Sequence, residues 1–318
     1  MATYASKLRD TGIDNSTIKL DGQGRITAPG IREPFSSGNG SIPSVFYADG
    51  NVVSSGDGKS WATAFKTLAE GLAACHTYMS TSANRAWAQR ATLYCCADNF
   101  TEDITAFAEK TDIIGVGTTN QHPRPRIEGT HVLVATSTDT YHGCRWFNVE
   151  FYGAAAGIIV DIPAGQNGQE FHNCVFSAVD AATIGLRAVQ SHDMTVRNCW
   201  FDPNTSNAGF STAAIQINAG SCTNFFLKDN RIFSSGIGLD FNCTAGQAIN
   251  CWATGNDIFA TGQTIDDEST NLFVNRNNLI SAAAEGTGSS WTFNLARACD
   301  NTSTGSDNTE NVPDLASQ

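Results

Sequence analysis

Six short segments between Cys144 and Ile280 repeat one pattern of apolar and polar positions. Aligned over eight columns, they read CRWFNVEF, QEFHNCVF, MTVRNCWF, FFLKDNRI, CWATGNDI and LFVNRNNL. The first and third columns are mostly apolar, and this spacing of two is the period of a β-strand with one buried face. The sixth-column residues follow one another at intervals of 25, 25, 31, 26 and 21 residues. A period of this size indicates a solenoid, a propeller or an array.

The later columns predict how the chain turns within each repeat. The apolar phase slips by one residue between the third and eighth columns, which predicts a bend. The fifth column holds residue types that tolerate a left-handed backbone, namely Asn148, Asn173, Asn198, Asp229 and Gly255, whereas Arg276 is an exception that weakens the last repeat. The sixth column changes from thiols to amides that can hydrogen-bond from coil to coil: Cys174, Cys199, Asn230, Asn256 and Asn277. One coil per period, with like residues stacked on like, predicts an all-β chain folded as a parallel β-helix.

The extent of the repeat divides the chain into three parts. Residues 46–280 form the predicted β-helix, residues 1–45 form an N-terminal attachment arm, and residues 281–318 form a last partial rung and an acidic tail. Ahead of the first coil, Ser60 is the predicted N-cap of a helix over residues 61–75. The apolar residues Phe65, Leu68 and Leu72 recur there at helical spacing. Such a helix would cover the open end of the solenoid.

A second set of segments carries a family resemblance. The run GDGKSWATAFKTLAEGLAA, followed by TLYCCADNFTEDI and IIGVG, resembles the opening of right-handed parallel β-helix proteins of the pectate-lyase-like superfamily. That opening is common in bacterial surface proteins and in phage tailspikes and other virion proteins. The resemblance implies a right-handed coil and, by likeness to phage β-helices, a homotrimer. The superfamily's catalytic patterns cannot be carried over to this chain residue by residue, and a fold by itself does not imply an activity.

Composition narrows the classes of function. The net charge is −12, which argues against a broad basic surface for nucleic acid. No apolar run reaches the roughly 18–20 residues that span a bilayer, so no membrane partner is expected. Residues 1–30 contain no apolar core of signal-peptide type, so we expect synthesis in a host cytoplasm. Several of the ten cysteines lie on inward columns and are expected to be core thiols, with a Cys174–Cys199 disulfide as the alternative, and no cofactor is expected.

The best catalytic constellation in the sequence lies around the third repeat. It comprises Asp180, Arg187, His192 and Asp193, whose carboxylates on neighbouring rungs could pair for acid–base work on a glycosidic bond. All four lie outside the inward columns, so the favoured interpretation is that they are solvated turn residues.

Two further features suggest binding. Asp266, Asp267 and Glu268 form an acidic patch that could hold calcium, although the spaced pattern of a calcium loop is absent and a solvated turn is favoured. Trp200 lies between inward columns and is expected to point outward. It is a candidate contact for a second subunit or for a glycan, with the subunit favoured.

Together these features predict a non-enzymatic structural protein of a phage or virus particle. We expect a homotrimeric β-helix that decorates the capsid or forms part of the tail, and that binds other virion proteins through residues 1–45. The alternative is a polysaccharide-binding or polysaccharide-degrading tailspike, a glycoside hydrolase or lyase, whose partner is a host surface glycan.

Overall fold

The protein comprises two compact units, Met1–Pro43 and Ser44–Gln318. The structure, a computed structural model, describes residues 19–20, 26–27, 44–80, 90–96, 99–117, 124–136, 143–153, 156–178, 182–202, 209–218, 220–244, 248–269, 271–281, 291–292, 298–299 and 301–304. In the first unit, β1 (Lys19–Leu20) and β2 (Ile26–Thr27) pair antiparallel. The rest of the predicted arm and most of the predicted tail lie outside the described residues.

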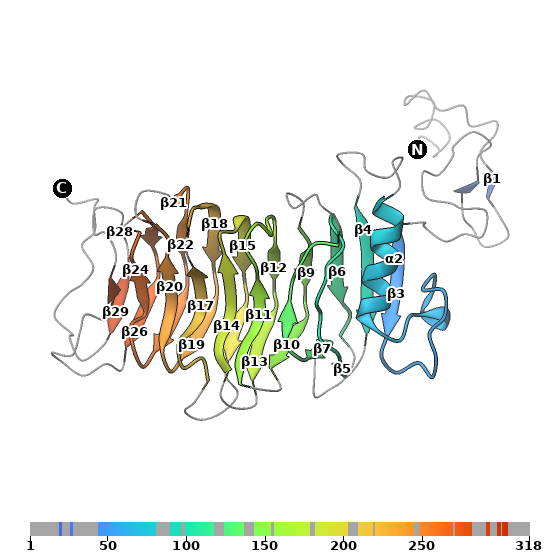
Figure 1. The fold of residues 1–318 in the computed structure, drawn as a ribbon, viewed down its shortest axis with the longest axis horizontal. Coiled ribbons are helices and arrows are strands. Elements are labelled where there is room, and N and C mark those ends of the chain that lie inside the picture. The colour runs from blue at the N-terminus through green and yellow to red at the C-terminus, as the bar shows by residue number, and fades with distance from the viewer. Residues whose placement is uncertain are drawn as a thin grey trace, which may run out of the picture. The chain divides into compact units, whose positions relative to one another are not determined.

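Three parallel sheets form the second unit, and their strands follow one another along a single axis (Figure 1). The eleven-stranded sheet contains β3 (Val45–Asp49), β4 (Ala91–Cys96), β6 (Thr111–Gly115), β9 (Arg145–Phe147), β12 (Glu170–His172), β15 (His192–Arg197), β18 (Cys222–Lys228), β21 (Ala248–Ile249), β22 (Trp252–Thr254), β25 (Phe273–Asn275) and β28 (Ala298–Cys299). The nine-stranded sheet contains β5 (Asn99–Thr101), β7 (Arg126–Glu128), β10 (Glu150–Gly153), β13 (Val175–Ala178), β16 (Trp200–Asp202), β19 (Arg231–Ser234), β23 (Asp257–Ala260), β26 (Asn278–Ser281) and β29 (Thr302–Thr304). The seven-stranded sheet contains β8 (His131–Val132), β11 (Gly157–Ile162), β14 (Ala182–Val189), β17 (Ala213–Asn218), β20 (Ile237–Asn242), β24 (Ile265–Asp267) and β27 (Trp291–Thr292).

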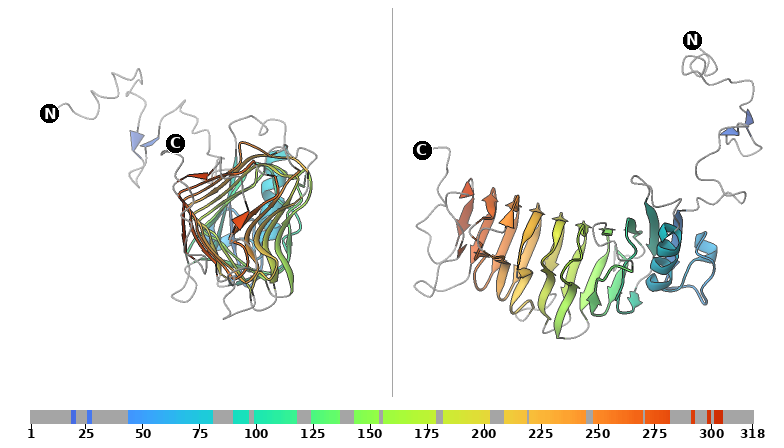
Figure 2. Two further views of the ribbon diagram at one scale, coloured as in Figure 1. Left: turned by 90° about the vertical axis from the view of Figure 1, so that its left-hand side faces the viewer. Right: turned by 45° about the horizontal axis from the view of Figure 1, so that its top comes forward.

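Each complete coil adds one strand to each sheet, except that both β21 and β22 of one coil pair with β18, and this topology confirms the predicted parallel β-helix. The view along the axis in Figure 2 shows the three sheets surrounding one interior. The aligned columns of the sequence coincide with the observed register: Trp146, Phe171 and Val196 are Cα partners on successive strands. In the eighth column, the rings of Phe151, Phe176 and Phe201 stack inside the coil at centroid distances of 5.4 and 4.4 Å. Like residues therefore pack on like, as the repeat requires.

The fifth column forms the corner between the eleven-stranded and nine-stranded sheets. All six of its residues have a left-handed backbone: Asn148 (φ 55°), Asn173 (φ 54°), Asn198 (φ 52°), Asp229 (φ 55°), Gly255 (φ 68°) and Arg276 (φ 54°). Arg276 therefore makes the same turn as the other five, although its residue type was expected to weaken the last repeat. Arg is poorly suited to positive φ, so the sheets on either side of this corner hold it in that conformation.

The sixth column carries a buried ladder of amides. The Asn256 Oδ1 accepts hydrogen bonds from the backbone N–H and the Nδ2 of Asn230, at 3.0 and 2.9 Å. Asn277 repeats this arrangement with Asn256 at 2.9 and 2.8 Å, and Asn301 repeats it with Asn277 at 2.9 Å. Each Nδ2 also donates to a backbone carbonyl, such as that of Leu227. The predicted coil-to-coil hydrogen bonding of Asn side chains is confirmed.

Asn301 extends this ladder into a further coil that the six-segment alignment omits. Residues 296–303 read ARACDNTS, with β28 and β29 on either side of Asn301. Ala298 pairs with Val274 in the third column, and Ser303 pairs with Leu279 in the eighth. The predicted last partial rung thus contains strands of all three sheets. The small side chains in these columns hid it from a search for apolar periodicity.

A helix lies at the N-terminal end of the stack, as predicted, but its boundaries differ. The chain forms a short 3-10 helix, η2 (Trp61–Thr63), followed by α2 (Leu68–Ser80). The prediction of a helix over residues 61–75 capped by Ser60 was wrong because the capping residues are Thr67 and Glu70. The Glu70 N–H donates to the Thr67 Oγ1, and the Thr67 N–H donates to the Glu70 Oε2, both at 3.2 Å. This reciprocal pair is a capping box.

Helix α2 is attached to the first coils by its N-terminus and by its apolar face. The Glu102 carboxylate accepts hydrogen bonds from the backbone N–H groups of Leu68 and Ala69, at 2.7 and 3.0 Å. Gly71 lies so close to β4 that an added Cβ would come within 2.7 Å of the Leu93 side chain. In the described residues, no helix is long and apolar enough to cross a membrane.

The first prediction concerns the amide ladder. Replacing Asn256 by Ala leaves the buried N–H and Nδ2 groups of Asn230 without their shared acceptor. Each unsatisfied buried group costs about 1–3 kcal/mol, so we expect the free energy of unfolding to fall by about 3 kcal/mol. Denaturant titration measures this loss. Thr254→Ala, on the outer face of the same coil, is the control and should change stability by less than about 0.5 kcal/mol. Equal losses in both variants would contradict a structural role for the ladder.

His131 is a titratable side chain inside the coil. It is fully buried on β8, where its Nδ1 accepts the Ile104 N–H at 3.1 Å and its Nε2 lies 3.3 Å from the Ile127 carbonyl oxygen. Burial lowers the pKa of His131 from 6.5 to about 4, against an opposing hydrogen bond to Ile127. The folded protein therefore holds this ring in its neutral form at neutral pH.

The second prediction follows from that lowered pKa. Between pH 6.5 and about 4 the unfolded chain binds a proton at His131 that the folded chain does not. The stability from the neutral ring is fully present above pH 6.5 and is lost as the pH falls toward 4, by about 3 kcal/mol. In His131→Asn the free energy of unfolding should depend less steeply on pH across this range, whatever the stability of the variant at pH 7. If the free energy of unfolding changes with pH as steeply in the variant as in the wild type, His131 is not the group responsible.

Candidate functional site

The three described residues of the predicted catalytic constellation, Arg187, His192 and Asp193, make separate structural contacts. Arg187 on β14 makes a bidentate ion pair with Asp161, its Nε donating to Oδ1 at 2.9 Å and its Nη2 to Oδ2 at 2.7 Å. His192 lies on a different sheet, where its Nδ1 is 2.7 Å from the Thr223 Oγ1. Asp180 lies outside the described residues. The structure therefore does not bring Arg187 and His192 onto one face.

Asp193 belongs to a second column of left-handed corner residues. Asp193, Asn224 and Asn250 have φ values of 56°, 57° and 56° and lie on successive coils. The Asn224 Nδ2 donates to the Asp193 Oδ1 at 2.6 Å, and the Asn250 Nδ2 donates to the Asn224 Oδ1 at 2.8 Å. This exposed ladder gives Asp193 the role of a turn residue, which is the interpretation that its outward position favoured.

The predicted acidic patch is divided by the alternation of β24. Asp267 points inward and is fully buried, and its carboxylate accepts the Ser269 and Leu272 backbone N–H groups at 3.0 and 3.1 Å. Asp266 points outward on the seven-stranded sheet, and Glu268 is exposed. In the part of the chain that the structure describes, no group of three or more His, Cys, Asp or Glu side chains is arranged to hold a metal ion.

The carboxylate that lies beside Asp266 on the outer face is that of Asp240, not that of Asp267 as the sequence predicted. Asp240 and Asp266 are Cα partners on β20 and β24, so their carboxylates project from adjacent strands about 4.8 Å apart. The Gln216 Nε2 donates to the Asp240 Oδ2 at 2.7 Å. Burial raises the pKa of Asp240, and the nearby Glu268 charge adds to this rise. Burial also raises the pKa of Asp266, together with the charges of Asp240 and Glu268.

This pair is the one place among the described residues where the structure puts two outward carboxylates with raised pKa values on adjacent strands. A pair of neighbouring carboxyl groups is what glycoside hydrolysis uses as its acid and its base or nucleophile. Sequence reasoning missed Asp240 because it lies outside the aligned eight-residue segments. One signal was available in the sequence: Asp240 and Asp266 follow their sixth-column residues, Asn230 and Asn256, at equal spacing, so they could have been aligned as equivalent positions.

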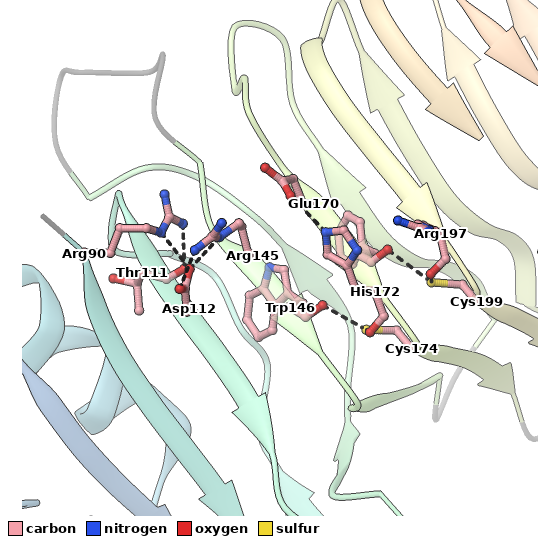
Figure 3. A network of polar contacts seen from close by, with 11 residues as sticks. Arg90, Thr111, Asp112, Arg145, Trp146, Glu170, His172, Cys174, Arg197 and Cys199 are labelled. Carbon is pink, nitrogen blue, oxygen red and sulfur yellow. Dashed lines mark hydrogen bonds and ion pairs between the residues drawn. The ribbon is translucent and has the colours of Figure 1, made fainter. Parts of the chain in front are cut away.

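A second polar network lies on the outer face of the eleven-stranded sheet (Figure 3). Asp112 lies between two guanidinium groups, 2.7 Å from the Arg90 Nε and 2.6 Å from the Arg145 Nη2. Its hydrogen bonds raise the pKa of Arg145. Farther along, the His172 Nε2 is 2.9 Å from the Glu170 Oε2. The charges of these coils are therefore largely neutralised within the network.

Two cations follow on the next coils without such neutralisation. Arg197 and Lys228 are Cα partners on β15 and β18, and both are exposed. Like charges directly opposite each other in a sheet are unfavourable. The ion pairs found among the described residues include neither of them. An anionic group from outside the coil would complement this pair.

The last coils carry outward apolar side chains on both sides of the fifth-column corner, one of them exposed and the others half-buried. On the eleven-stranded sheet, Phe226 is 36% exposed, and the rings of Trp252 and Phe273 stack at 4.5 Å. On the nine-stranded sheet, the rings of Phe233 and Phe259 stack at 4.8 Å, and Ile280 continues the row as the Cα partner of Phe259. We name this surface the apolar corner, with a first flank of Phe226, Trp252 and Phe273 and a second flank of Phe233, Phe259 and Ile280.

Trp200 points outward beside the second flank, as predicted, with 40% of its surface exposed. The Arg231 guanidinium carbon lies 5.6, 5.0 and 6.0 Å from the ring centroids of Trp200, Phe233 and Phe259. This cation holds three aromatic rings in one surface. The sequence analysis named Trp200 as a candidate contact residue but did not foresee the rings around it.

The buried cysteines are thiols, as expected for core residues. Cys174 and Cys199 are free, and their Sγ atoms donate to the carbonyls of Trp146 and Phe171, both at 3.4 Å. Burial raises the pKa of Cys75 to about 12 and that of Cys144 well above its usual value. Thiols with such values remain protonated at neutral pH and are poor nucleophiles and ligands.

Comparison of the chain with protein-family models, with curated proteins and with solved structures finds no match. The parallel β-helix is therefore established by the strand pairing itself. Kinship with the pectate-lyase-like superfamily or with phage virion proteins stays a prediction.

The third prediction concerns the Asp240–Asp266 pair. A raised pKa in the folded protein means that the stability contributed by the protonated carboxyl group is present at low pH and is lost as the pH rises through that pKa. Asp266→Asn removes the repulsion with Asp240 and should raise the unfolding temperature at pH 7, with the gain shrinking toward pH 4. Asp257→Asn is the control, because its Cα partner Arg231 carries the opposite charge. Stabilisation of both variants, or of neither, would contradict the predicted coupling.

Proposed function

We propose that this chain is a non-enzymatic structural subunit of a virus or phage particle. In this proposal it assembles as a homotrimer that decorates the capsid or forms part of the tail, and residues 1–45 attach it to other virion proteins. The observation that carries the proposal is the apolar corner. Its two rows of outward apolar side chains, with Phe226 exposed and the other flank residues half-buried, are of the kind that can serve protein association.

The distribution of polar groups supports the structural role. Arg187, His192 and Asp193, the groups best suited to catalysis on sequence grounds, are each bonded to a neighbouring coil. Their contacts hold the register of the solenoid. Outward polar groups that bond from coil to coil, as these three do, suit a subunit whose task is to present a rigid surface.

The fourth prediction tests assembly and location. Light scattering coupled to size-exclusion chromatography should give three times the chain mass of 33.8 kDa. Quantitative mass spectrometry of purified particles should detect the chain, on the order of hundreds of copies for a capsid component or a few dozen for a tail component. A monomer at all concentrations, or absence of the chain from particles, would contradict the proposal.

A second candidate function is favoured by the Asp240–Asp266 pair. Their adjacent carboxyl groups fit a polysaccharide-degrading tailspike acting as a glycoside hydrolase, and the exposed Arg197–Lys228 pair would suit an anionic glycan. The test is release of reducing ends from capsular or pectic polymers. Turnover that is abolished by Asp240→Asn and by Asp266→Asn, but retained in Asp257→Asn, would replace the structural proposal.

A further inference from the structure

Three buried thiols gather where the chain passes from the seven-stranded sheet into the eleven-stranded sheet. Cys222 is the first residue of β18, Cys243 follows the last residue of β20, and Cys251 lies between β21 and β22. All three are at most 3% exposed. We name this group the thiol cluster.

Strand pairing places the members of the thiol cluster beside one another. The Thr244 N–H donates to the Gly220 carbonyl oxygen at 3.0 Å, so the segment after β20 lies next to the segment before β18. Strand β21 pairs with the start of β18, and the Cys251 Sγ lies 3.5 Å from the Cys222 carbonyl oxygen. The Cys222 thiol is therefore within hydrogen-bonding contact of the thiols of both Cys243 and Cys251.

The coil does not require sulfur at these positions. Ala248 is the Cα partner of Cys222 on the next coil, and it is buried in the same interior. Cys251 belongs to the first column of the repeat, where Phe225 and Leu272 fill the equivalent positions before and after it. Apolar side chains without sulfur therefore satisfy the packing on adjacent coils.

The other pair of neighbouring thiols, drawn in Figure 3, has a structural task that accounts for it. Cys174 and Cys199 occupy the sixth column. The Cys199 Sγ donates to the Phe171 carbonyl at 3.4 Å, just as the Asn230 Nδ2 donates to the Val196 carbonyl at 2.9 Å one coil later. These two thiols thus continue the amide ladder. The thiol cluster lies outside that column, so the ladder does not explain it.

Contact between the thiols makes them chemically unequal. A hydrogen bond from Cys222 stabilises the thiolate of Cys251 and lowers the pKa of Cys251. Hydrogen bonds with Cys243 and with Cys251 raise the pKa of Cys222. Because the thiolate is the reactive form of cysteine, Cys251 is the nucleophile of the cluster, and Cys222 is the thiol beside it that keeps its proton.

We propose that Cys222 and Cys251 are an oxidation site, at which a peroxide converts the two thiols into a disulfide that joins two successive coils. The Cys251 thiolate attacks one oxygen of hydrogen peroxide, so that an S–O bond forms and the O–O bond breaks. The hydroxide released takes up the proton that Cys251 gave up and becomes water. The Cys222 sulfur then attacks the sulfenic acid, the S–S bond forms, and the S–O bond breaks. The Cys222 proton leaves with the hydroxyl group as a second water.

The disulfide would add a covalent tie to a stack that the described coils otherwise hold by hydrogen bonds and packing. It closes a loop between β18 and β22, which restricts the unfolded chain and stabilises the folded one. This inference goes beyond the proposed structural role and does not depend on it, since it concerns a modification within one chain.

The test starts from the fully reduced protein treated with hydrogen peroxide, a small oxidant that reaches buried thiols when the structure opens locally. After unfolding in denaturant, maleimide labelling should find two thiols fewer than the ten of the reduced chain. Peptide mapping without reductant should join the peptides of Cys222 and Cys251, with a mass lower by two hydrogen atoms.

Single variants assign the two roles. Cys222→Ala should abolish the disulfide, and it should fold because Ala248 fills the equivalent position on the next coil. Cys251→Ala should slow the loss of thiols at least about tenfold, because the stabilised thiolate is gone. Cys243→Ala should still form the Cys222–Cys251 bond. Cys75→Ala, which removes a buried thiol of α2 outside the cluster, is the control and should oxidise as the wild type does.

The unfolding temperature gives a second measurement that does not depend on labelling. Oxidation should raise it by about 5 °C or more in the wild type and in Cys75→Ala. Dithiothreitol should reverse the rise. Cys222→Ala should show no rise, and circular dichroism before oxidation establishes that each variant is folded.

Three results would overturn the inference. In the first, all ten thiols remain reduced in peroxide. In the second, Cys174 and Cys199 form a disulfide while the thiol cluster stays reduced. In the third, the bond joins Cys222 to Cys243, which removes the assigned role of Cys251. None of these results bears on the proposed assembly, which is judged by the mass of the complex and by the presence of the chain in particles.

Discussion

The left-handed corner is the constraint on which the rest of this structure depends. A β-strand can continue into a second sheet of the same coil only if the chain turns sharply at one residue, and at six successive coils that residue has φ between 52° and 68°. The turn fixes where each strand starts and therefore which residues point inward. Because the turn recurs at the same column, each coil meets its neighbour in register. The stacked rings and the amide ladder follow from that register.

Register also explains why most polar groups of the described coils are engaged in structure. A parallel stack places equivalent side chains about 4.8 Å apart, within reach of hydrogen bonds and ring contacts. Asn256 bonds to Asn230 and Asn277, and Arg187 bonds to Asp161, because each pair occupies equivalent positions on neighbouring coils. Where equivalent positions carry like charges, as at Asp240 and Asp266, the same proximity becomes unfavourable. Positions with neighbouring like charges, together with columns of outward apolar side chains, are therefore the best candidates for functional sites.

The candidate sites could be predicted from sequence only in part. The outward position of Trp200 follows from alternation along a strand, and its exposure agrees with that prediction. Asp267 was grouped with Asp266 because they are adjacent in sequence, but adjacent residues in a strand point to opposite faces. Asp240 comes from the preceding coil, 26 residues earlier, and only its equal spacing after the sixth-column residue of its own rung relates it to Asp266. The boundaries of α2 were missed because Ser60 was taken for the cap instead of the Thr67–Glu70 pair.

The sequence by itself determined the architecture of the coil. Its period, its apolar alternation and the Asn, Asp and Gly residues of the fifth column specify strand, turn and stacking, since these are local preferences repeated many times. Tertiary structure alone decided which outward side chains meet. Equivalent side chains of neighbouring coils in the aligned segments are 21 to 31 residues apart in sequence, and their contacts depend on the register that the corners impose. For this reason Arg276 could adopt a left-handed turn against its own preference, and for this reason the two flanks of the apolar corner lie along one edge.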